Sequence, residues 1–359
     1  MTELRCEAEV KLDHLPAYLD KIEDRLQSFQ AVASRSKERV EFAFPFGDGR
    51  FDMKPGRLVM SARSDDRDGL ARIKDLLATA VNVYAREEAP SIRWRGDCCD
   101  DTALPQFREM TVGDIRDLTP RMKRVRLLGS DLGRFAKFGG MHIRMLFPTP
   151  DIPDPVWPTL GENGLALWPP AQLRPTPRAY TVRKLDVAAG WMDVDILIHD
   201  GDSVGSRWAI SARRGMKVGI MGPVGRPVRL DAQWYLLGAD ETGLPAVARL
   251  LETLDPATRG IAFIEVADES ERQPIDNLTM IDLRWIVRNE VPAGRDDRLA
   301  QAVLAVEWPS DCTTFGWFAA EAQAASIVRD HWRGAMGLGR DRTLAATYWR
   351  SGTSGFMAG

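Results

Sequence analysis

Two changes of pattern along the sequence predict a multidomain protein. An N-terminal α+β module is followed by an antiparallel β-barrel and a C-terminal doubly wound α/β domain. The first change, near residues 96–101, separates mixed strands and helices from a series of short β-rich runs. The second, after residue 231, begins an alternation of apolar strands and helices that is typical of a parallel sheet. We therefore expect domains at 1–100, 101–231 and 232–359 of the 359 residues.

The N-terminal module is predicted from strand-like alternation and two amphipathic helices. Residues 4–12 alternate as a strand does, and residues 39–63 read as strands around glycine-containing turns. Apolar residues at helical spacing predict helices over 15–29 and 68–88, and 91–96 form a last short strand. The region has no catalytic constellation, so we interpret it as a docking or oligomerisation unit.

The middle region contains five β-rich runs separated by turn residues. They read "MKRVRLLG", "MHIRMLFP", "RAYTVRKL", "MDVDILIH" and "MKVGIMGPVG". Their number and spacing predict a small antiparallel barrel. We expect the proline-rich residues 152–177 to form an extended loop across its surface.

The C-terminal region alternates three strands with three helices. The strands are expected at 234–240, 260–268 and 313–321, and the helices at 244–254, 298–306 and 322–335. The closing run "TLAATYWRSG" adds a final segment. In an open α/β sheet of this kind, ligands bind at the carboxyl ends of the strands.

Composition limits the partners and the compartment. The 48 basic residues nearly balance the 51 acidic ones, so electrostatics give no reason to expect nucleic acid as the main partner. No apolar run approaches the roughly 18 residues of a membrane span, and the charged N-terminus does not resemble a signal peptide. We expect a cytoplasmic protein without membrane insertion.

The four cysteines are Cys6, Cys98, Cys99 and Cys312. The adjacent pair Cys98–Cys99 suggests a metal or redox centre. However, no second cysteine pair and no His-x-His sequence stands at zinc spacing. With only four histidines in the chain, we predict no metal site and a structural or incidental role for the pair.

The stretch "RAYTVR" places two arginines and a tyrosine on one predicted strand. Because a strand has period two, Arg178 and Tyr180 share one face, while Thr181 and Arg183 point the other way. An arginine fork suits phosphate, and a tyrosine ring suits a planar aromatic group, so a flavin nucleotide would fit this face. The alternative is an exposed strand with two solvated arginines.

Two further segments contain small residues before a predicted helix. Gly201, Ser203, Gly205 and Ser206 lead into "RWAISA", and amides at a helix start can bind an anion. His199 either lines the same pocket or is structural. In the second segment, Asp240, Glu241, Thr242 and Gly243 follow the strand that ends at Gly238; the alternative is that Thr242 merely caps the helix. This is not the Gly-x-Gly-x-x-Gly fingerprint of dinucleotide-binding proteins.

Taken together, these motifs resemble the siderophore-interacting protein family of ferric-siderophore reductases, which are ferredoxin-reductase-like flavoproteins. The resemblance covers about residues 107–352 and depends on "RAYTVR", on the segment from His199 to "SRWA", and on "GADETGLPAVARLLE", "WFAAE" and "YWRSG". The first hundred residues resemble a small uncharacterised domain that sometimes accompanies this family.

The resemblance implies an FAD-binding barrel and an NAD(P)H-binding-like domain. The implied FAD contacts are Arg178, Tyr180, Thr181, His199, Ser206, Trp208 and Ala209. The implied nicotinamide side contains Asp240, Glu241 and Thr242, with Glu321 of "WFAAE" nearby. The sequence departs from the family pattern at Asp200, where a glycine usually follows the histidine, and at Ser203-Val204, where Gly-Pro is usual.

The implied activity is reduction of a ferric siderophore through FAD, with NADPH or NADH as electron donor and release of ferrous iron. A flavin can accept a hydride and release single electrons, and ferrous iron is held less tightly by hard oxygen ligands. Arg144 and Arg350 are candidates to attract an anionic chelate; the alternative for each is a solvated surface arginine. A flavoprotein that works with a ferredoxin or another protein partner is one competing interpretation, and a binding module without electron transfer is another. No catalytic side chain is predicted.

Overall fold

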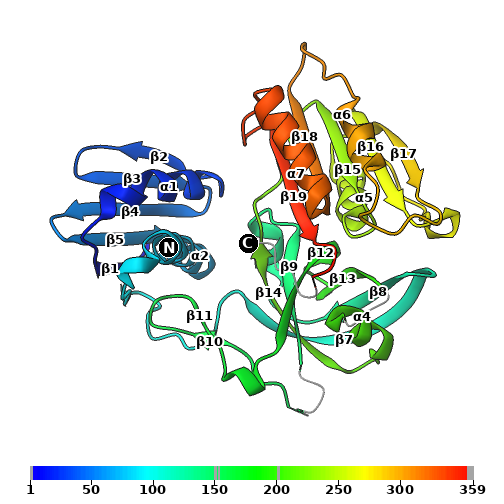
Figure 1. Cartoon of the computed structure of the whole chain (residues 1–359). Coiled ribbons are helices and arrows are strands. Elements are labelled where there is room, and N and C mark those ends of the chain that lie inside the picture. Colours follow the sequence, from blue (N-terminus) through cyan, green and yellow to red (C-terminus); the bar gives the residue numbers. More distant parts are fainter. Residues whose placement is uncertain (1–2, 149–151, 153, 200–202, 354–359) are drawn as a thin grey trace. The chain divides into compact units, whose positions relative to one another are not determined.

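The computed structural model describes residues 3–148, 152, 154–199 and 203–353. Its internal contacts divide the chain into two compact units (Figure 1). The first unit comprises Met1–Phe107 together with Val156–Arg174, and the second comprises Arg108–Pro155 together with Pro175–Gly359. The two units are described separately.

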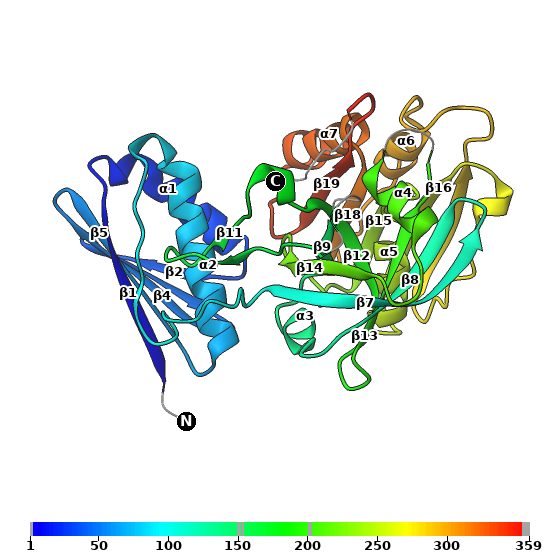
Figure 2. The ribbon, with the colours of Figure 1, turned by 90° about the horizontal axis from the view of Figure 1, so that it is seen from below.

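The first unit is built on a six-stranded antiparallel sheet in the order β2-β3-β4-β5-β1-β6. The strands are β1 (Leu4–Lys11), β2 (Val32–Arg35), β3 (Arg39–Phe44), β4 (Gly47–Lys54), β5 (Arg57–Ser64) and β6 (Arg95–Gly96). The helices α1 (Leu15–Gln27) and α2 (Arg67–Tyr84) pack on one face, and the short helix η1 (Arg86–Glu88) follows (Figure 2). Alternate residues of β3 are buried and exposed, as expected for a sheet covered on one side. The predicted α+β module is confirmed.

Residues 156–174 of the proline-rich segment belong to the first unit, so the prediction of a loop across the barrel surface is wrong. It contains a hairpin of β10 (Thr159–Leu160) and β11 (Ala166–Leu167) and the short helix η2 (Ala171–Leu173). The indole nitrogen of Trp94 donates to the Asn163 carbonyl at 3.0 Å, and the Trp94 amide donates to the Glu162 carbonyl at 3.2 Å. Buried Trp94 therefore gives the segment an apolar and hydrogen-bonded docking surface that sequence periodicity does not reveal.

The second unit begins with a closed barrel in the order β12-β13-β8-β7-β14-β9, which confirms the predicted barrel. Its strands are β7 (Phe107–Thr119), β8 (Met122–Leu128), β9 (His142–Phe147), β12 (Thr176–Asp186), β13 (Trp191–Leu197) and β14 (Lys217–Val224). The long strand β7 was missed because its apolar residues do not alternate regularly with polar ones. Helix α3 (Gly133–Lys137) precedes β9, and α4 (Val204–Ser211) follows β13.

The rest of the second unit is a parallel five-stranded sheet in the order β17-β16-β15-β18-β19. The strands are β15 (Trp234–Ala239), β16 (Arg259–Val266), β17 (Met280–Val287), β18 (Thr314–Glu321) and β19 (Thr343–Trp349). One face is covered by α5 (Leu244–Thr253); the other is covered by α6 (Arg298–Leu304) and α7 (Ala322–Asp330). The helix η3 (Glu269–Glu271) follows β16, and a π-helical turn, η4 (His331–Ala335), extends α7. The doubly wound arrangement is confirmed, while β17 is a strand that the sequence analysis did not identify.

The strand order places a topological switch point at the centre of this sheet. From β15 the chain continues outward to β16 and β17 on one side and later to β18 and β19 on the other. Ligands of open α/β proteins bind outside the carboxyl ends of the strands at such a point. Asp240 follows the end of β15, and Glu321 ends the adjacent β18.

Candidate functional site

Strand β12 presents two sets of predicted site residues on opposite faces. Arg178 and Tyr180 pair with Met145 and Ile143 of β9, whose side chains belong to the barrel core. Thr181 pairs with His142, and therefore faces the other way. The predicted face assignment is thus confirmed by the register.

Helix α4 approaches Tyr180 closely. A side chain at Gly205 would place its Cβ 1.9 Å from the Tyr180 hydroxyl, so only glycine allows this approach. The Tyr180 ring makes an edge contact with Phe147, and Phe147 packs against Trp208 of α4, with ring centroids 6.0 and 5.2 Å apart. Burial raises the pKa of the Tyr180 phenol, which therefore stays neutral at physiological pH.

Ser206 connects the start of α4 to the end of β13. Its buried hydroxyl donates to the Leu197 carbonyl at 3.2 Å and accepts from the His199 amide at 3.3 Å. Its own amide donates to the side chain of Ser203, the N-cap of the helix. The predicted helix is confirmed, and Ser203 acts as its N-cap. Asp200 lies outside the described residues. The side chain of His199 is exposed.

Three side chains near β12 retain unused hydrogen-bonding capacity. The indole nitrogen of Trp208 is buried and has no hydrogen-bond partner in the described part of the chain. The buried Thr181 hydroxyl lies beside the Tyr348 phenol but completes no hydrogen bond of good geometry there. Arg178 donates to the carbonyl of Pro177 at 2.7 Å, and no described carboxylate lies within ion-pair distance of it. Buried polar atoms without partners are rare in native proteins, so these groups fit a ligand with phosphate and ring polar atoms, as FAD has.

Asp240 lies buried at the switch point and organises the loop before α5. One carboxylate oxygen accepts from the Thr242 amide and hydroxyl at 2.9 and 2.5 Å and from the Gly243 amide at 3.3 Å. The other accepts from the indole nitrogen of Trp349 at 2.6 Å. Burial, followed by the nearby Glu241 charge, raises the pKa of Asp240 to about 6. Thr242 does not cap α5, whose N-cap is Gly243 without a side-chain hydrogen bond.

Glu241 is committed to a buried ion-pair network. Its carboxylate accepts from the two terminal nitrogens of Arg288 at 2.6 and 2.8 Å, and Arg288 also donates to Glu265 at 3.1 Å. All three side chains are buried. Burial raises the pKa of Glu265 to about 7, against the opposing effect of Arg288. Glu241 therefore helps to join the ends of β15, β16 and β17.

Glu321 holds the closing segment of the described chain. One carboxylate oxygen accepts from the Gln323 amide at the start of α7, and the other accepts from the Ser351 amide at 3.1 Å. The side chain is buried and serves as the N-cap of α7. Its position at the carboxyl end of β18 agrees with the predicted location, and its contacts are structural.

His142 and Tyr348 connect the barrel to the α/β sheet and were missed as site residues. The His142 ring nitrogen Nε2 and the Tyr348 hydroxyl share a short hydrogen bond, and the rings meet edge to face at 5.4 Å. Burial, with a smaller effect of Arg249, lowers the pKa of His142 to about 4, so the ring is neutral at physiological pH. The two residues lie in "MHIR" and "TYWR", motifs whose arginines alone were selected from the sequence.

The two predicted substrate arginines differ in exposure. Arg144 is half-buried on β9, opposite Ala179 of β12 and Met221 of β14, on the same face as Thr181 and His142. Arg350 is exposed and directly follows β19. Arg144 therefore lies on the strand that carries His142, and Arg350 directly follows the strand that carries Tyr348 and Trp349.

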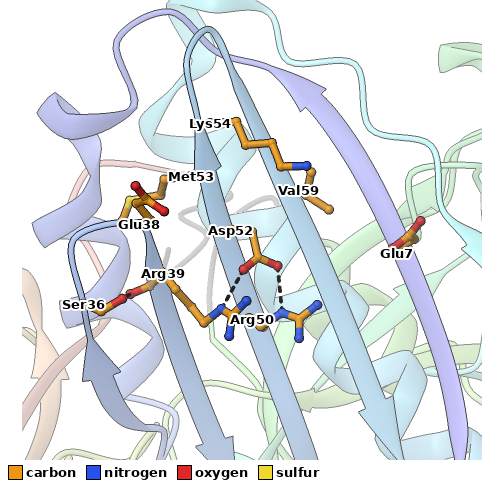
Figure 3. Close-up of a pocket in the computed structure, with 9 residues that line it drawn as sticks. All are labelled: Glu7, Ser36, Glu38, Arg39, Arg50, Asp52, Met53, Lys54 and Val59. Carbon is orange, nitrogen blue, oxygen red and sulfur yellow. Dashed lines mark hydrogen bonds and ion pairs between the residues drawn. The ribbon is translucent and has the colours of Figure 1, made fainter.

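The first unit has its own hollow, which is internally neutralised. This hollow lies on the sheet and has a volume of about 550 Å³, and the residues that line it include Arg39, Arg50 and Asp52 (Figure 3). Asp52 accepts from Arg39 at 2.7 Å and lies 2.8 Å from Arg50, so the principal charges already satisfy one another.

The described residues contain neither a cluster of metal-ligating side chains nor a helix suited to span a membrane. No group of three or more His, Cys, Asp and Glu side chains among them is placed to hold a metal ion. No helix in the described ranges is both long and apolar enough to cross a membrane.

Three family models match successive parts of the chain. Residues 7–95 match an uncharacterized protein conserved in bacteria (DUF2218), residues 111–227 match a siderophore-interacting FAD-binding domain, and residues 232–352 match siderophore-interacting protein. An uncharacterized protein of Mycobacterium tuberculosis is 34% identical over 253 residues, which cover 66% of this chain and 88% of that protein.

Two curated relatives are described as reductases. The NADPH-dependent ferric-chelate reductase of Escherichia coli is 32% identical over 251 residues, covering 68% of this chain and 94% of that protein. The ferric vibriobactin reductase ViuB of Vibrio cholerae is 29% identical over 238 residues, covering 66% and 86%. Among solved structures, a siderophore utilization protein from T. fusca is 33% identical with a TM-score of 0.62, covering 71% of this chain and 98% of that one.

Proposed function

Because the chain belongs to the siderophore-interacting protein family, we propose that it is an FAD-dependent oxidoreductase that reduces ferric siderophores with electrons from NAD(P)H and releases ferrous iron. The observations that carry the cofactor part are the buried, unpartnered atoms Trp208 Nε1 and Thr181 Oγ1 around β12, together with the Arg178 guanidinium, which bonds to the Pro177 carbonyl but makes no ion pair with the described residues. The reductase part is supported by the activities named for the Escherichia coli and Vibrio cholerae relatives.

In this proposal, the two faces of β12 hold different parts of FAD. Arg178 and the amides at the start of α4 bind the phosphates, since an arginine and a helix N-terminus both favour anions. Tyr180, Trp208 and Ala209 line the site, and His199 and Ser206 shape the segment that leads into α4. Thr181 offers its hydroxyl toward the flavin ring. When bound, the flavin supplies hydride acceptance and one-electron release.

The carboxyl ends of β15 and β18 form the proposed nicotinamide side. Asp240 and Thr242 stand at the switch point, where a nucleotide would bind in an open α/β sheet. Glu241 and Glu321 act there as positioning residues, because their carboxylates are engaged by Arg288 and by backbone amides. Asp240 can hold a proton near neutral pH, since burial raises its pKa to about 6.

We assign Arg144 and Arg350 to attraction of an anionic ferric chelate. Both arginines are always charged. Arg144 lies two residues after His142 and Arg350 lies two residues after Tyr348, and the hydrogen bond between His142 and Tyr348 joins β9 to β19. Iron enters here as substrate within its chelate.

We also propose that the protein is cytoplasmic, which is supported by its four free cysteines. We further propose domain boundaries near residues 100 and 231, which are supported by the limits of the family models.

The experiment that tests this proposal is ferrous-iron production by the FAD-loaded protein without oxygen. NADPH, NADH and a reduced ferredoxin are compared as donors, with a ferric chelate as acceptor and a colorimetric ferrous chelator as reporter. Rapid iron release with a nicotinamide nucleotide supports the proposal. Release with ferredoxin alone would replace the nucleotide donor by a protein partner, and no release with any donor would contradict reductase activity.

A further inference from the structure

Two adjacent thiols in the first unit each lie beside a cation. The guanidinium Nε of Arg67 is 3.3 Å from the sulfur of Cys98, and the ammonium of Lys74 is 3.6 Å from the sulfur of Cys99. Both cations come from α2, whereas the thiols follow β6. Both cysteines are half-buried and free.

The Lys74 ammonium is in an unusual environment. Its side chain is only 5% exposed, and no carboxylate of the described residues lies within ion-pair distance of it. The ammonium lies 5.9 Å from the centroid of the Trp94 ring. A buried charge requires a counter-charge or neutralisation. The Cys99 sulfur is the ionisable group in contact with it.

The two aspartates near Cys98 and Cys99 have other partners and do not supply a counter-charge to Lys74. Asp101 pairs with Arg67 at 3.3 Å, and the Asp97 carboxylate accepts from the Arg5 amide at 2.7 Å. As a thiol, Cys99 donates to the Asp97 carbonyl at 3.5 Å; as a thiolate, it accepts from Lys74. Cys6 lies near both thiols but is 5% exposed, and burial raises its pKa to about 12, so it stays protonated and shielded.

We propose that Cys99 is a nucleophilic thiol, activated by Lys74, that forms mixed disulfides with small-molecule disulfides. The Cys99 thiolate attacks one sulfur of the disulfide, a new sulfur–sulfur bond forms, and the old one breaks. The other half leaves as a thiolate and takes a proton from water, so the small disulfide is the oxidant and no further reagent is needed. Thiolates beside cations are the reactive form of cysteine in such sites.

The first test compares the four cysteines within the full-length native protein. Limiting iodoacetamide is added at neutral pH, and peptide mass spectrometry follows each cysteine with time. Cys99 should react at least about tenfold faster than Cys312, which is also half-buried but has no cation contact among the described residues. Cys6 should remain unmodified, which also reports that the first unit is folded. Equal rates for Cys99 and Cys312 would overturn the proposal.

The second test removes or keeps the charge at position 74. Lys74→Met should slow Cys99 at least about fivefold and leave Cys312 unchanged, whereas Lys74→Arg should retain most of the rate. Arg67→Gln, a change at an exposed cation, should affect Cys98 and not Cys99. An unchanged Cys99 rate in a Lys74→Met protein whose Cys6 stays protected would show that Lys74 does not activate the thiol. If Cys6 becomes reactive in the Lys74→Met protein, the first unit has unfolded. The proposal is then judged by the rates of Cys99 and Cys312 in the wild-type protein.

The third test uses glutathione disulfide as the probe. Native protein should gain one glutathionyl group, on the peptide that contains Cys99, and a thiol reductant should remove it. Modification of Cys312 in preference to Cys99 would contradict the assignment. The assignment would also be contradicted if glutathione disulfide modified the urea-unfolded chain readily but added no glutathionyl group to the native protein.

Discussion

The indole nitrogen of Trp349 donates a 2.6 Å hydrogen bond to the carboxylate of Asp240, a residue 109 positions earlier in the chain. The preceding residue, Tyr348, bonds to His142 of the barrel strand β9. Two neighbours at the end of β19 therefore hold the switch-point loop and the barrel together within the second unit. This arrangement gives the closing motif a structural role next to the proposed flavin site.

The first prediction concerns Trp349→Phe, which removes the donor to Asp240. In the folded protein the pKa of Asp240 is raised to about 6, so the folded state holds this proton more tightly than the unfolded state does. The contribution of Asp240 to the free energy of unfolding therefore falls as the pH rises from about 4 to 6. The Trp349 indole stabilises the charged carboxylate of Asp240, so its removal should make the loss of stability at high pH larger. We expect the free energy of unfolding to drop by about 1.5–3 kcal/mol at pH 8 and by less than about 1 kcal/mol at pH 5.

Tyr348→Phe is the matched control for this pH dependence. It removes a hydrogen bond to His142, whose pKa of about 4 leaves the ring neutral at both pH values. Its cost should therefore be the same at pH 5 and pH 8. Equilibrium urea unfolding measures all four values, and an equal loss at both pH values for Trp349→Phe would contradict the account of Asp240.

The second prediction compares the two arginines of "RAYTVR". Arg178→Ala should weaken FAD binding about 10- to 100-fold, because a charge-assisted phosphate contact contributes roughly 1.5–3 kcal/mol. The stability of the protein without FAD should change little, since Arg178 makes no ion pair with the described residues. Fluorescence titration of FAD and thermal unfolding measure the two effects.

Arg183→Ala should show the opposite pattern. Arg183 is 5% exposed, donates to both carboxylate oxygens of Glu252 and lies 3.9 Å from Asp195. Removing one partner of a buried ion pair costs about 3–5 kcal/mol, so the variant without FAD should be strongly destabilised. Equal FAD dissociation constants for the two folded variants would reject the assignment of the two faces of β12.

The third prediction concerns the exposed Arg350. Arg350→Glu should slow reduction of an anionic ferric chelate several-fold, while FAD content and flavin reduction by NAD(P)H remain nearly unchanged. The effect should shrink as salt rises, because the Debye length is only about 10 Å at 0.1 M salt. A neutral chelate provides the control. If the variant lost FAD, or if both chelates slowed equally at every salt concentration, electrostatic recruitment would be the wrong account.

The sequence predicted the parts of the fold that have strong local periodicity. Alternation identified the β-rich runs of the barrel, and the strand–helix alternation identified the parallel sheet, because each signal repeats within a few residues. Strand β17 also alternates, with Met280, Asp282 and Arg284 exposed on one face, and the sequence analysis missed this signal. The docking of 156–174 depends on long-range contacts with Trp94, which no local pattern reports.

The site was predicted less completely than the fold. Arg178, Tyr180 and Thr181 could be placed on faces because strand geometry fixes alternate directions. The partnership of Asp240 with Trp349, and that of Glu241 with Arg288, joins residues far apart in the chain. Without the tertiary structure, a carboxylate that holds a loop together cannot be distinguished from one that faces a ligand.

The most direct test of the central claim is the visible spectrum of the protein loaded with FAD, recorded without oxygen before and after NAD(P)H and then after a ferric siderophore. The account predicts a visible absorption band of the oxidised flavin that bleaches with NAD(P)H and returns when the chelate is added. It also predicts that Arg178→Ala lowers the amount of bound flavin and that Arg350→Glu slows only the return of the band. A protein that binds no FAD, or whose reduced flavin is not reoxidised by any ferric chelate, would contradict the account.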